Sequence, residues 1–273
     1  MKASAKIQKM TFTVIVTVIA LSLIIVLPAK AITWGWPDGN LHPNVGAIVD
    51  ELGQICSGTL IYPNIFLTAG HCTDYLESLE ITEIYVTFDE DPWAVTSTWL
   101  PVKAVITHPD YNWGPYSNPY DVGVLILEEP AAGIPLANLP EKGFLDDLRK
   151  AGELRKGKEE ADFTVVGYGA TLYWPPPKFT YESKRQYAES EYQALLKSWL
   201  RMSQNQATGD GGTAYGDSGG PAFWTDPDTG EEILVGITSW GDVPCVASGF
   251  NYRVDTSDTL KFIAKVADEW LEE

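Results

Sequence analysis

Short apolar runs recur along most of the chain, separated by clusters of Pro, Gly, Asn and Asp, and this pattern is typical of β-strands. The runs span 45–49, 58–62, 84–88, 102–106 and 122–127, then 163–166, 221–224, 233–239 and 251–254. Between the two sets, residues 141–160 are dense in charge and poor in strand-forming residues. We expect this stretch to connect two β units and to hold one helical turn or more.

Two segments carry apolar residues at the spacing of a helix face, i, i+3, i+4, i+7 and i+8. They comprise Tyr192, Leu195, Leu196, Trp199 and Leu200, and then Ile263, Val266, Ala267, Trp270 and Leu271. We expect the first to form a surface helix on the second β unit. The second predicts a C-terminal helix, with Ser257 or Asp258 as its N-cap.

The first 31 residues have the pattern of a targeting segment. Lysines precede an uncharged apolar run at 11–27, and Ala29 and Ala31 are the small residues that a signal peptidase reads. We predict a signal peptide at 1–31 and a secreted protein that keeps no stable membrane association after cleavage. The alternative is an uncleaved membrane anchor, because the run has 17 residues and a membrane span needs about 17–25.

The remainder of the chain is strongly acidic. Residues 32–273 contain 15 basic and 37 acidic side chains, a net charge of −22. Binding of nucleic acid requires Lys and Arg to neutralise phosphates, so this balance argues against a nucleic-acid partner. It also disfavours acidic substrates through long-range repulsion.

A glycine-rich segment, GDSGGP at 216–221, is the first candidate for chemistry. Ser218 carries a hydroxyl that becomes a good nucleophile when a base removes its proton. The glycines permit a sharp turn in which the amides of Gly216 and Ser218 point at one spot, where an oxyanion would sit. The alternative is a glycine-rich loop with an incidental serine.

A hydroxyl nucleophile needs a base, and the base needs an acid that orients it. The chain has three histidines. His71 follows an apolar run, whereas His42 and His108 each precede a proline and are expected at the surface. Asp121 stands at the start of the run 122–127, where it either caps a turn or holds an imidazole.

Four segments together resemble the trypsin-like, chymotrypsin-fold serine peptidases. They are TAGHC at 68–72, DVGVL at 121–125, GDSGGP at 216–221 and ITSWG at 237–241. The resemblance implies an all-β fold of two antiparallel six-stranded β-barrels, with the active site between them and a C-terminal helix. On this basis 32–140 is expected to form the first barrel, 141–160 the connection, and 161–273 the second barrel with the helix.

The resemblance also implies the chemistry. Ser218 would attack a peptide carbonyl, His71 would take its proton, Asp121 would orient His71, and the amides of Gly216 and Ser218 would form the oxyanion hole. This predicts a secreted, monomeric serine endopeptidase that acts on polypeptides through an acyl-enzyme and uses no cofactor or metal. The alternatives are an esterase acting on small esters and a non-catalytic binding protein of the same fold.

The cysteines add a structural expectation. In the family, the pair that corresponds to Cys56 and Cys72 forms a disulfide. A third cysteine, Cys245, is left over, because the position of its usual partner is Ala214 here. Cys245 is therefore either a buried thiol or a reactive odd cysteine.

The resemblance places the substrate site around the primary specificity pocket. Gly212, six residues before the nucleophile, would lie at its base. Asp210 is close in sequence but off register; the alternative is a shift of two residues in this loop, which would bring Asp210 to the base, where the family's aspartate selects Arg or Lys. With Gly212 at the base, an uncharged pocket follows, roomy enough for large apolar or aromatic side chains, and the strand at Ser239 would pair with the substrate. The residues expected to bind substrate are Gly212, Thr213, Ser239, Trp240, Gly241 and Gly249.

A last expectation concerns activation. In the family, a newly cut N-terminus folds inward and pairs with the aspartate that precedes the nucleophile. Signal cleavage after Ala31 would make Ile32 the new N-terminus, and Asp217 would be its partner. The alternative is that Ile32 begins a loose arm and that other groups hold Asp217.

Overall fold

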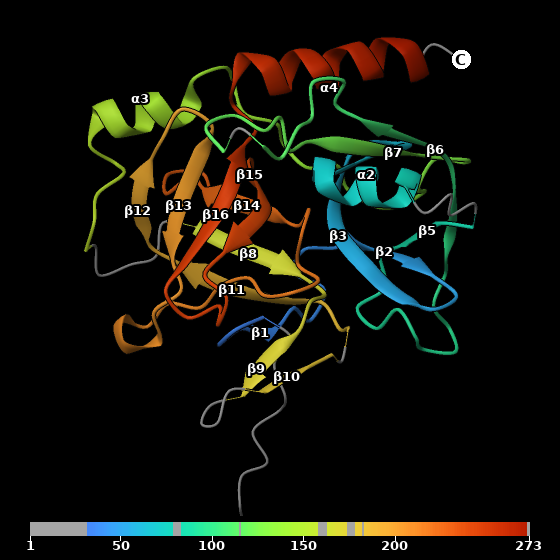
Figure 1. Ribbon diagram of the computed structural model, residues 1–273, viewed down its shortest axis with the longest axis horizontal. Helices are drawn as coiled ribbons and strands as arrows, with labels where there is room; N and C mark the ends of the chain where they lie inside the picture. Colours follow the sequence, from blue (N-terminus) through green and yellow to red (C-terminus); the bar gives the residue numbers. More distant parts are fainter. Residues whose placement is uncertain are drawn as a thin grey trace, which may run out of the picture.

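The computed structural model describes residues 32–271 apart from 79–82, 115, 158–162, 174–177 and 182. The predicted signal peptide lies outside the described residues. Two β units stand side by side, the first on the right of Figure 1 and the second on the left, with the C-terminal helix across one end. Both units are built of β-strands, which confirms the predicted all-β fold.

The first unit is a closed antiparallel barrel in the order β2-β3-β4-β7-β6-β5. Its strands are β2 (Val45–Asp50), β3 (Gly53–Tyr62), β4 (Ile65–Thr68), β5 (Tyr85–Thr87), β6 (Leu100–Thr107) and β7 (Gly123–Leu127). Every residue of β4 and β7 is buried, which explains why these strands are read as continuous apolar runs. Helix α2 (Gly70–Ser78) follows β4 directly.

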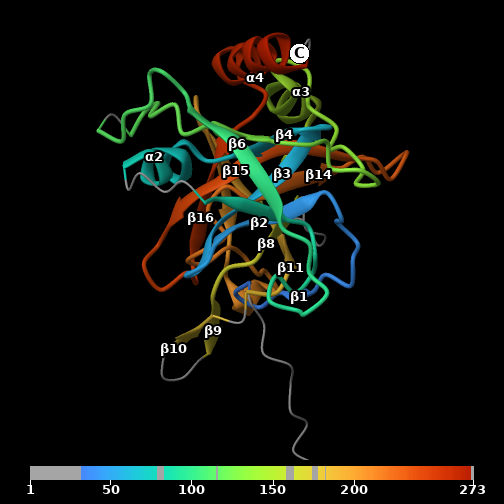
Figure 2. The same cartoon turned by 90° about the vertical axis from the view of Figure 1, so that its right-hand side faces the viewer.

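The second unit is an eight-stranded antiparallel sheet in the order β1-β11-β8-β14-β15-β16-β13-β12. Its strands are β1 (Trp36–Pro37), β8 (Phe163–Gly167), β11 (Gln186–Ser190), β12 (Tyr192–Leu195), β13 (Trp199–Ser203), β14 (Pro221–Thr225), β15 (Glu232–Gly241) and β16 (Ser248–Arg253). The sheet curls into a half-barrel, whereas six strands in a second barrel were expected. A two-stranded hairpin, β9 (Thr171–Tyr173) with β10 (Lys178–Thr180), projects at the end opposite the C-terminal helix (Figure 1, Figure 2).

The N-terminal strand belongs to the second unit. We expected residues from 32 onward to build the first barrel, but β1 pairs with β11, with Trp36 opposite Tyr187. The pairing is possible because the segment before β2 crosses from one unit to the other. The chain around Ile32 therefore packs near the serine loop of the second sheet.

The surface helix predicted over 192–200 is wrong, because these residues form the hairpin β12–β13. Leu195 lies opposite Leu200, and the amide of Leu196 donates to the carbonyl of Trp199 at 2.8 Å to close the turn. Leu196 sits in this turn and is exposed, whereas the other apolar positions point into the core. Two short buried strands joined by a tight turn thus reproduced the spacing of a helix face.

The charged connection contains a helix, α3 (Phe144–Ala151), as the composition suggested. Gly143 and Gly152 bound it with φ values of 80° and 82°, a left-handed conformation that glycine adopts without strain. The amide of Gly152 donates to the carbonyl of Arg149 and ends the helix.

The C-terminal helix α4 spans Ser257–Trp270, as predicted, but its N-cap is Thr256 rather than Ser257 or Asp258. The Thr256 hydroxyl accepts the amide of Thr259 at 3.2 Å. The helix buries Phe262, Ile263, Val266 and Ala267. Among the described helices, none is long and apolar enough to cross a membrane.

Candidate active site

His71 and Asp121 come together because they flank two neighbouring strands. His71 lies in the first turn of α2, just after β4, and Asp121 stands just before β7. β4 and β7 are antiparallel partners, with Thr68 opposite Gly123. The Asp121 carboxylate accepts the backbone amide of His71 at 2.8 Å, and both of its oxygens lie 3.1 Å from His71 Nδ1.

The environment of Asp121 favours its charged form. Burial alone would raise the pKa of this fully buried carboxyl, but the charge and hydrogen bonds of His71 and the hydroxyl of Ser239 outweigh burial and lower it. For His71, burial would lower the pKa, whereas the charge and hydrogen bond of Asp121 raise it above its usual value. Asp121 is therefore held as a carboxylate, and its charge favours the protonated form of His71.

The loop that carries Ser218 is held tightly from both units. The amide of Ser57 in β3 donates to the carbonyl of Ser218 at 2.8 Å, and the amide of Gly219 donates to Thr238 at 2.8 Å. Gly219 has a φ of 84°, and a Cβ at this position would lie 2.0 Å from Thr68 Oγ1. Only glycine fits at this contact between the two units, so steric exclusion explains why the motif has a glycine at position 219.

The two amides expected to form the oxyanion hole are free. Neither Gly216 nor Ser218 donates its amide in a hydrogen bond within the described residues. The Gly216 carbonyl accepts Gln54 Nε2 at 2.7 Å and Ser57 Oγ at 3.2 Å. Gln54 was not found from the sequence, because no motif marks it and its partner is 162 positions away.

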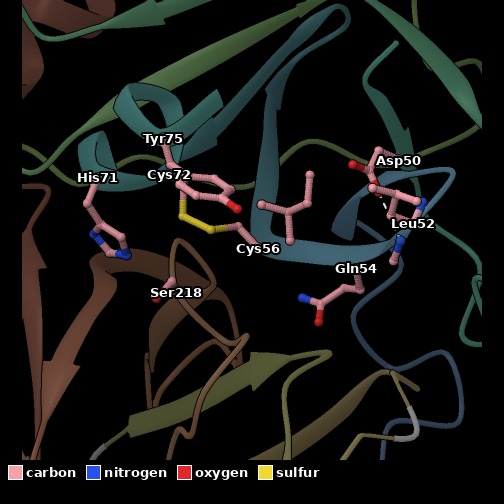
Figure 3. A pocket seen from close by; sticks show the side chains of 10 residues that line it. Asp50, Leu52, Gln54, Cys56, His71, Cys72, Tyr75 and Ser218 are labelled. Atoms are coloured by element: carbon pink, nitrogen blue, oxygen red, sulfur yellow. Dashed lines mark hydrogen bonds between the residues drawn. A yellow bond between two sulfur atoms is a disulfide. The ribbon is translucent and has the colours of Figure 1, made fainter. Parts of the chain in front are cut away.

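His71 and Ser218 border one cavity of about 740 Å³. Figure 3 shows the two side chains at one end of it, with the Cys56–Cys72 disulfide beside them. They share this cavity without a hydrogen bond between them in the described structure; catalytic hydrogen bonds often tighten only when substrate binds. The predicted disulfide is confirmed, and it ties β3 to α2 at the residue next to His71.

Ser218 also lines a second cavity, of about 310 Å³. Thr213, Ser239, Trp240 and Gly241 line it, as expected of a specificity pocket. Gly212 and Gly249 are buried but do not line it, because the side chain of Gln204 packs against both. Sequence analysis did not identify Gln204 or the bond from Ser239 to Asp121.

Asp210, which a shifted register would bring to the base, does not line this cavity. Its carboxylate accepts the amide of Glu191 at 3.1 Å and the hydroxyl of Thr208 at 2.7 Å. Cys245 is a free, buried thiol at the cavity wall, and burial raises its pKa to about 12. Of the two alternatives for Cys245, the structure has the buried thiol.

Asp217 and Ile32 are both fully buried. The Asp217 carboxylate accepts the amides of Gly169 and Ala214, each at 2.7 Å, and burial raises its pKa to about 7 despite these bonds. The backbone nitrogen of Ile32 donates to Gln186 Oε1 at 3.4 Å rather than to Asp217. The expected pairing is absent from the described contacts.

His42 and His108 were expected at the surface, and this prediction is wrong. His42 is 6% exposed and contacts the carboxylates of Asp38 and Glu232. His108 is 8% exposed and packs on Tyr120 and Phe262. A following proline marks a loop locally, but distant segments cover both loops.

A closed barrel beside a curled sheet, with a His–Asp pair and a serine at their junction, is the architecture of a chymotrypsin-fold serine protease. A sequence profile described as Trypsin matches residues 38–263, so the chain belongs to the trypsin family. The chain is 30% identical over 217 residues to a trypsin of Saccharopolyspora erythraea, covering 76% of this chain and 86% of that protein.

Two animal proteins are also similar. Glandular kallikrein-10 of Rattus norvegicus is 28% identical over 256 residues, or 86% of this chain and 85% of the relative. Lectizyme of Glossina austeni is 24% identical over 240 residues, which cover 81% of this chain and 77% of the relative. The chain thus covers most of the length of each relative.

Proposed function

We propose that this protein is a secreted serine endopeptidase with Ser218 as nucleophile, His71 as base and Asp121 as the residue that orients the base. One observation carries the proposal: the His71 ring is bonded through Nδ1 to a buried carboxylate, while it borders the cavity of Ser218. Such a ring is held in one tautomer, with Nε2 left to accept a proton.

The reaction follows from these positions. His71 Nε2 removes the proton from Ser218 Oγ as the oxygen attacks the peptide carbonyl, and the amides of Gly216 and Ser218 stabilise the resulting oxyanion. The imidazolium then protonates the leaving amine, which gives an acyl-enzyme. Water, deprotonated by the same ring, releases the acid and restores Ser218.

The end of β15 supplies the surface for a polypeptide substrate. Its pairing with β14 ends at Ile237, whereas its pairing with β16 continues to Gly241. Residues 239–241 therefore keep one unpaired edge beside the cavity, which supports addition of the substrate as an antiparallel strand. A small ester lacks this backbone, which favours a peptidase over the esterase alternative.

Labelling with a serine-directed phosphonate tests the assignment. The wild type should be labelled at Ser218, while Ser218→Ala and His71→Ala should not, because the reagent needs an activated hydroxyl. Cleavage of a casein substrate by the wild type, lost in Ser218→Ala, separates a peptidase from an esterase. A folded protein that is neither labelled nor active would be the binding protein of the alternative.

We also propose that removal of residues 1–31 activates the enzyme by freeing the α-ammonium of Ile32 to pair with Asp217. Support comes from the burial of both residues and from the raised pKa of Asp217, which a buried cation would lower. The freed end must exchange Gln186 for Asp217. Pairing raises the α-amino pKa above about 8, so its contribution is complete below that pH and is lost as the pH rises through the folded value.

Two proteins test this activation step, one beginning at Ile32 and one with a single extra residue in front. The extended form should be inactive and should gain activity when trimmed. Equal activity of the two forms at every pH would refute the pairing. An activity of the Ile32 form that falls at alkaline pH supports it.

A further inference from the structure

Gln204 follows β13 and is buried behind the specificity cavity, with 2% of its surface exposed. Its backbone amide donates to the carbonyl of Ala247 at 3.1 Å. Its side-chain Nε2 donates to the Thr213 carbonyl at 2.7 Å and to Thr213 Oγ1 at 3.3 Å. Because Thr213 lines the cavity, the carboxamide is fixed directly against the cavity wall.

The carboxamide fills the space that three glycines would otherwise leave open. A Cβ on Gly212 would lie 2.3 Å from Gln204 Cγ, and one on Gly249 would lie 3.2 Å from Nε2. A Cβ on Gly241, which lines the cavity, would lie 3.6 Å from Oε1. The absence of side chains at these glycines therefore makes room for Gln204 rather than for a longer substrate side chain.

The side-chain oxygen of Gln204 is an unusual group for a protein interior. Gln204 Oε1 is buried without a hydrogen-bond partner among the described residues. A buried acceptor without a partner lowers stability, and native proteins contain few of them. Gln204 therefore makes its bonds to Thr213 at the cost of a buried oxygen without a partner, and this favours a role for the carboxamide at the pocket.

Among the described residues that line the cavity, Asp242 carries the one carboxylate, and its oxygens are already engaged. Asp210 does not line the cavity. Asp242 lines the cavity, but its carboxylate already accepts three backbone amides, at 2.8–3.1 Å. These amides come from Val246, Ala247 and Ser248.

We propose that Gln204 forms the base of the primary specificity pocket, so that the enzyme prefers an uncharged residue of medium length, such as Leu, Met or Gln, before the cleaved bond. An aromatic ring is too long because it meets the carboxamide, and a cation finds only the carboxylate of Asp242, which already accepts three backbone amides. This selection rests on the proposed peptidase function. It narrows the preference for large apolar or aromatic side chains that the glycines alone indicated, because it excludes the aromatic ones.

Peptides that differ only in this residue, with Leu, Met, Gln, Phe, Tyr, Arg or Lys, test the proposal through kcat/KM. We expect the wild type to favour Leu, Met and Gln over Phe and Arg by about tenfold or more, since pocket contacts of this size discriminate by roughly 10–200-fold. Gln204→Ala should raise the ratio of Phe to Leu by about tenfold. Gln204→Glu should raise the ratio of Arg to Leu by at least as much.

Two further variants make the result decisive. Gln193→Ala is the control, because Gln193 accepts the Ser248 hydroxyl at 3.0 Å and does not line the pocket; its ratios should match the wild type. If Gln204→Ala does not fold, Gln204→Asn is the milder truncation and should shift the Phe to Leu ratio in the same direction.

Titration of active sites with the phosphonate separates the two possible failures. A wild type that is not labelled refutes the peptidase proposal. A labelled wild type that prefers Phe or Arg refutes the role of Gln204. Labelled variants of Gln204 whose ratios equal those of the wild type refute it as well.

Discussion

Two histidine–aspartate pairs lie within the described part of the chain, and they differ in what the second ring nitrogen contacts. In both, Nδ1 faces a fully buried carboxylate, Asp121 for His71 and Asp38 for His42. His42 Nε2 meets a second carboxylate, Glu232, at 3.2 Å. The ring of His71 is 27% exposed and borders the cavity of Ser218.

Because of this difference, His71 keeps a ring nitrogen for its proposed role as a base, whereas His42 is held as a cation. Burial alone would lower the pKa of His42, but the hydrogen bonds and charges of Asp38 and Glu232 raise it to about 9, so that it stays protonated at neutral pH. Asp38 also accepts Arg185 Nε at 2.9 Å, and Arg185 donates to the carbonyls of Val45 and Phe88 in the first barrel. The His42 pair therefore joins the two units, while the His71 pair keeps one nitrogen for chemistry.

The largest effect should follow from changes in the His71 pair and its serine. We expect Ser218→Ala, His71→Ala and Asp121→Asn each to lower kcat by about 10³-fold or more, because the three act as one unit. Measurement of kcat on a peptide substrate, with His42→Ala as the comparison, checks this. A loss of similar size in folded His42→Ala would contradict the division of roles.

The second effect concerns stability. His42→Ala removes the cation that Asp38 and Glu232 share, although Asp38 keeps Arg185; a hydrogen bond to a charged group contributes about 1.5–3 kcal/mol. We expect the free energy of unfolding to fall accordingly, while kcat per active site stays near that of the wild type. His108→Ala is the matched control, because His108 is equally buried but packs on aromatic rings rather than carboxylates, and its loss should be smaller.

The third effect is the pH dependence of that stability. The folded pKa of His42 lies above its unfolded value of about 6.5. Its contribution is therefore complete below about pH 6.5 and is lost as the pH rises through about 9. The difference in unfolding free energy between wild type and His42→Asn should shrink from about pH 6 to about pH 10; a constant difference would show that His42 is not the titrating group.

The smallest effect should come from Ser239, whose hydroxyl donates to Asp121. Ser239→Ala removes one hydrogen bond to a charged group, worth ~1.5 kcal/mol at the low end, and should lower kcat about tenfold. Thr87→Ala removes a buried hydroxyl outside the site and should leave kcat unchanged. An unchanged kcat in Ser239→Ala would mean that His71 alone is enough to hold Asp121.

The sequence by itself was enough to predict the features that depend on local patterns and short motifs. The apolar runs predicted strands of the first barrel, because period and composition act within a few residues, whereas the barrel itself was expected from the family resemblance. The spacing at 263–271 predicted α4 for the same reason. The resemblance in four short segments predicted the family and the Cys56–Cys72 disulfide, both of which are confirmed, whereas the roles of His71, Asp121 and Ser218 stay predictions that the measurements above will test.

Only the tertiary structure decided the features that depend on residues far apart in the chain. The segment 192–200 follows helical spacing, yet it forms the hairpin β12–β13, whose second strand pairs with β16, a strand about 50 residues further along the chain. His42 looked like a loop residue because its partner Glu232 lies 190 positions away. Gln204 packs against Gly212, Gly241 and Gly249, which lie on three other segments of the chain. In each case the burial and charge of a side chain are set by its neighbours in space, and a local sequence pattern carries no record of them.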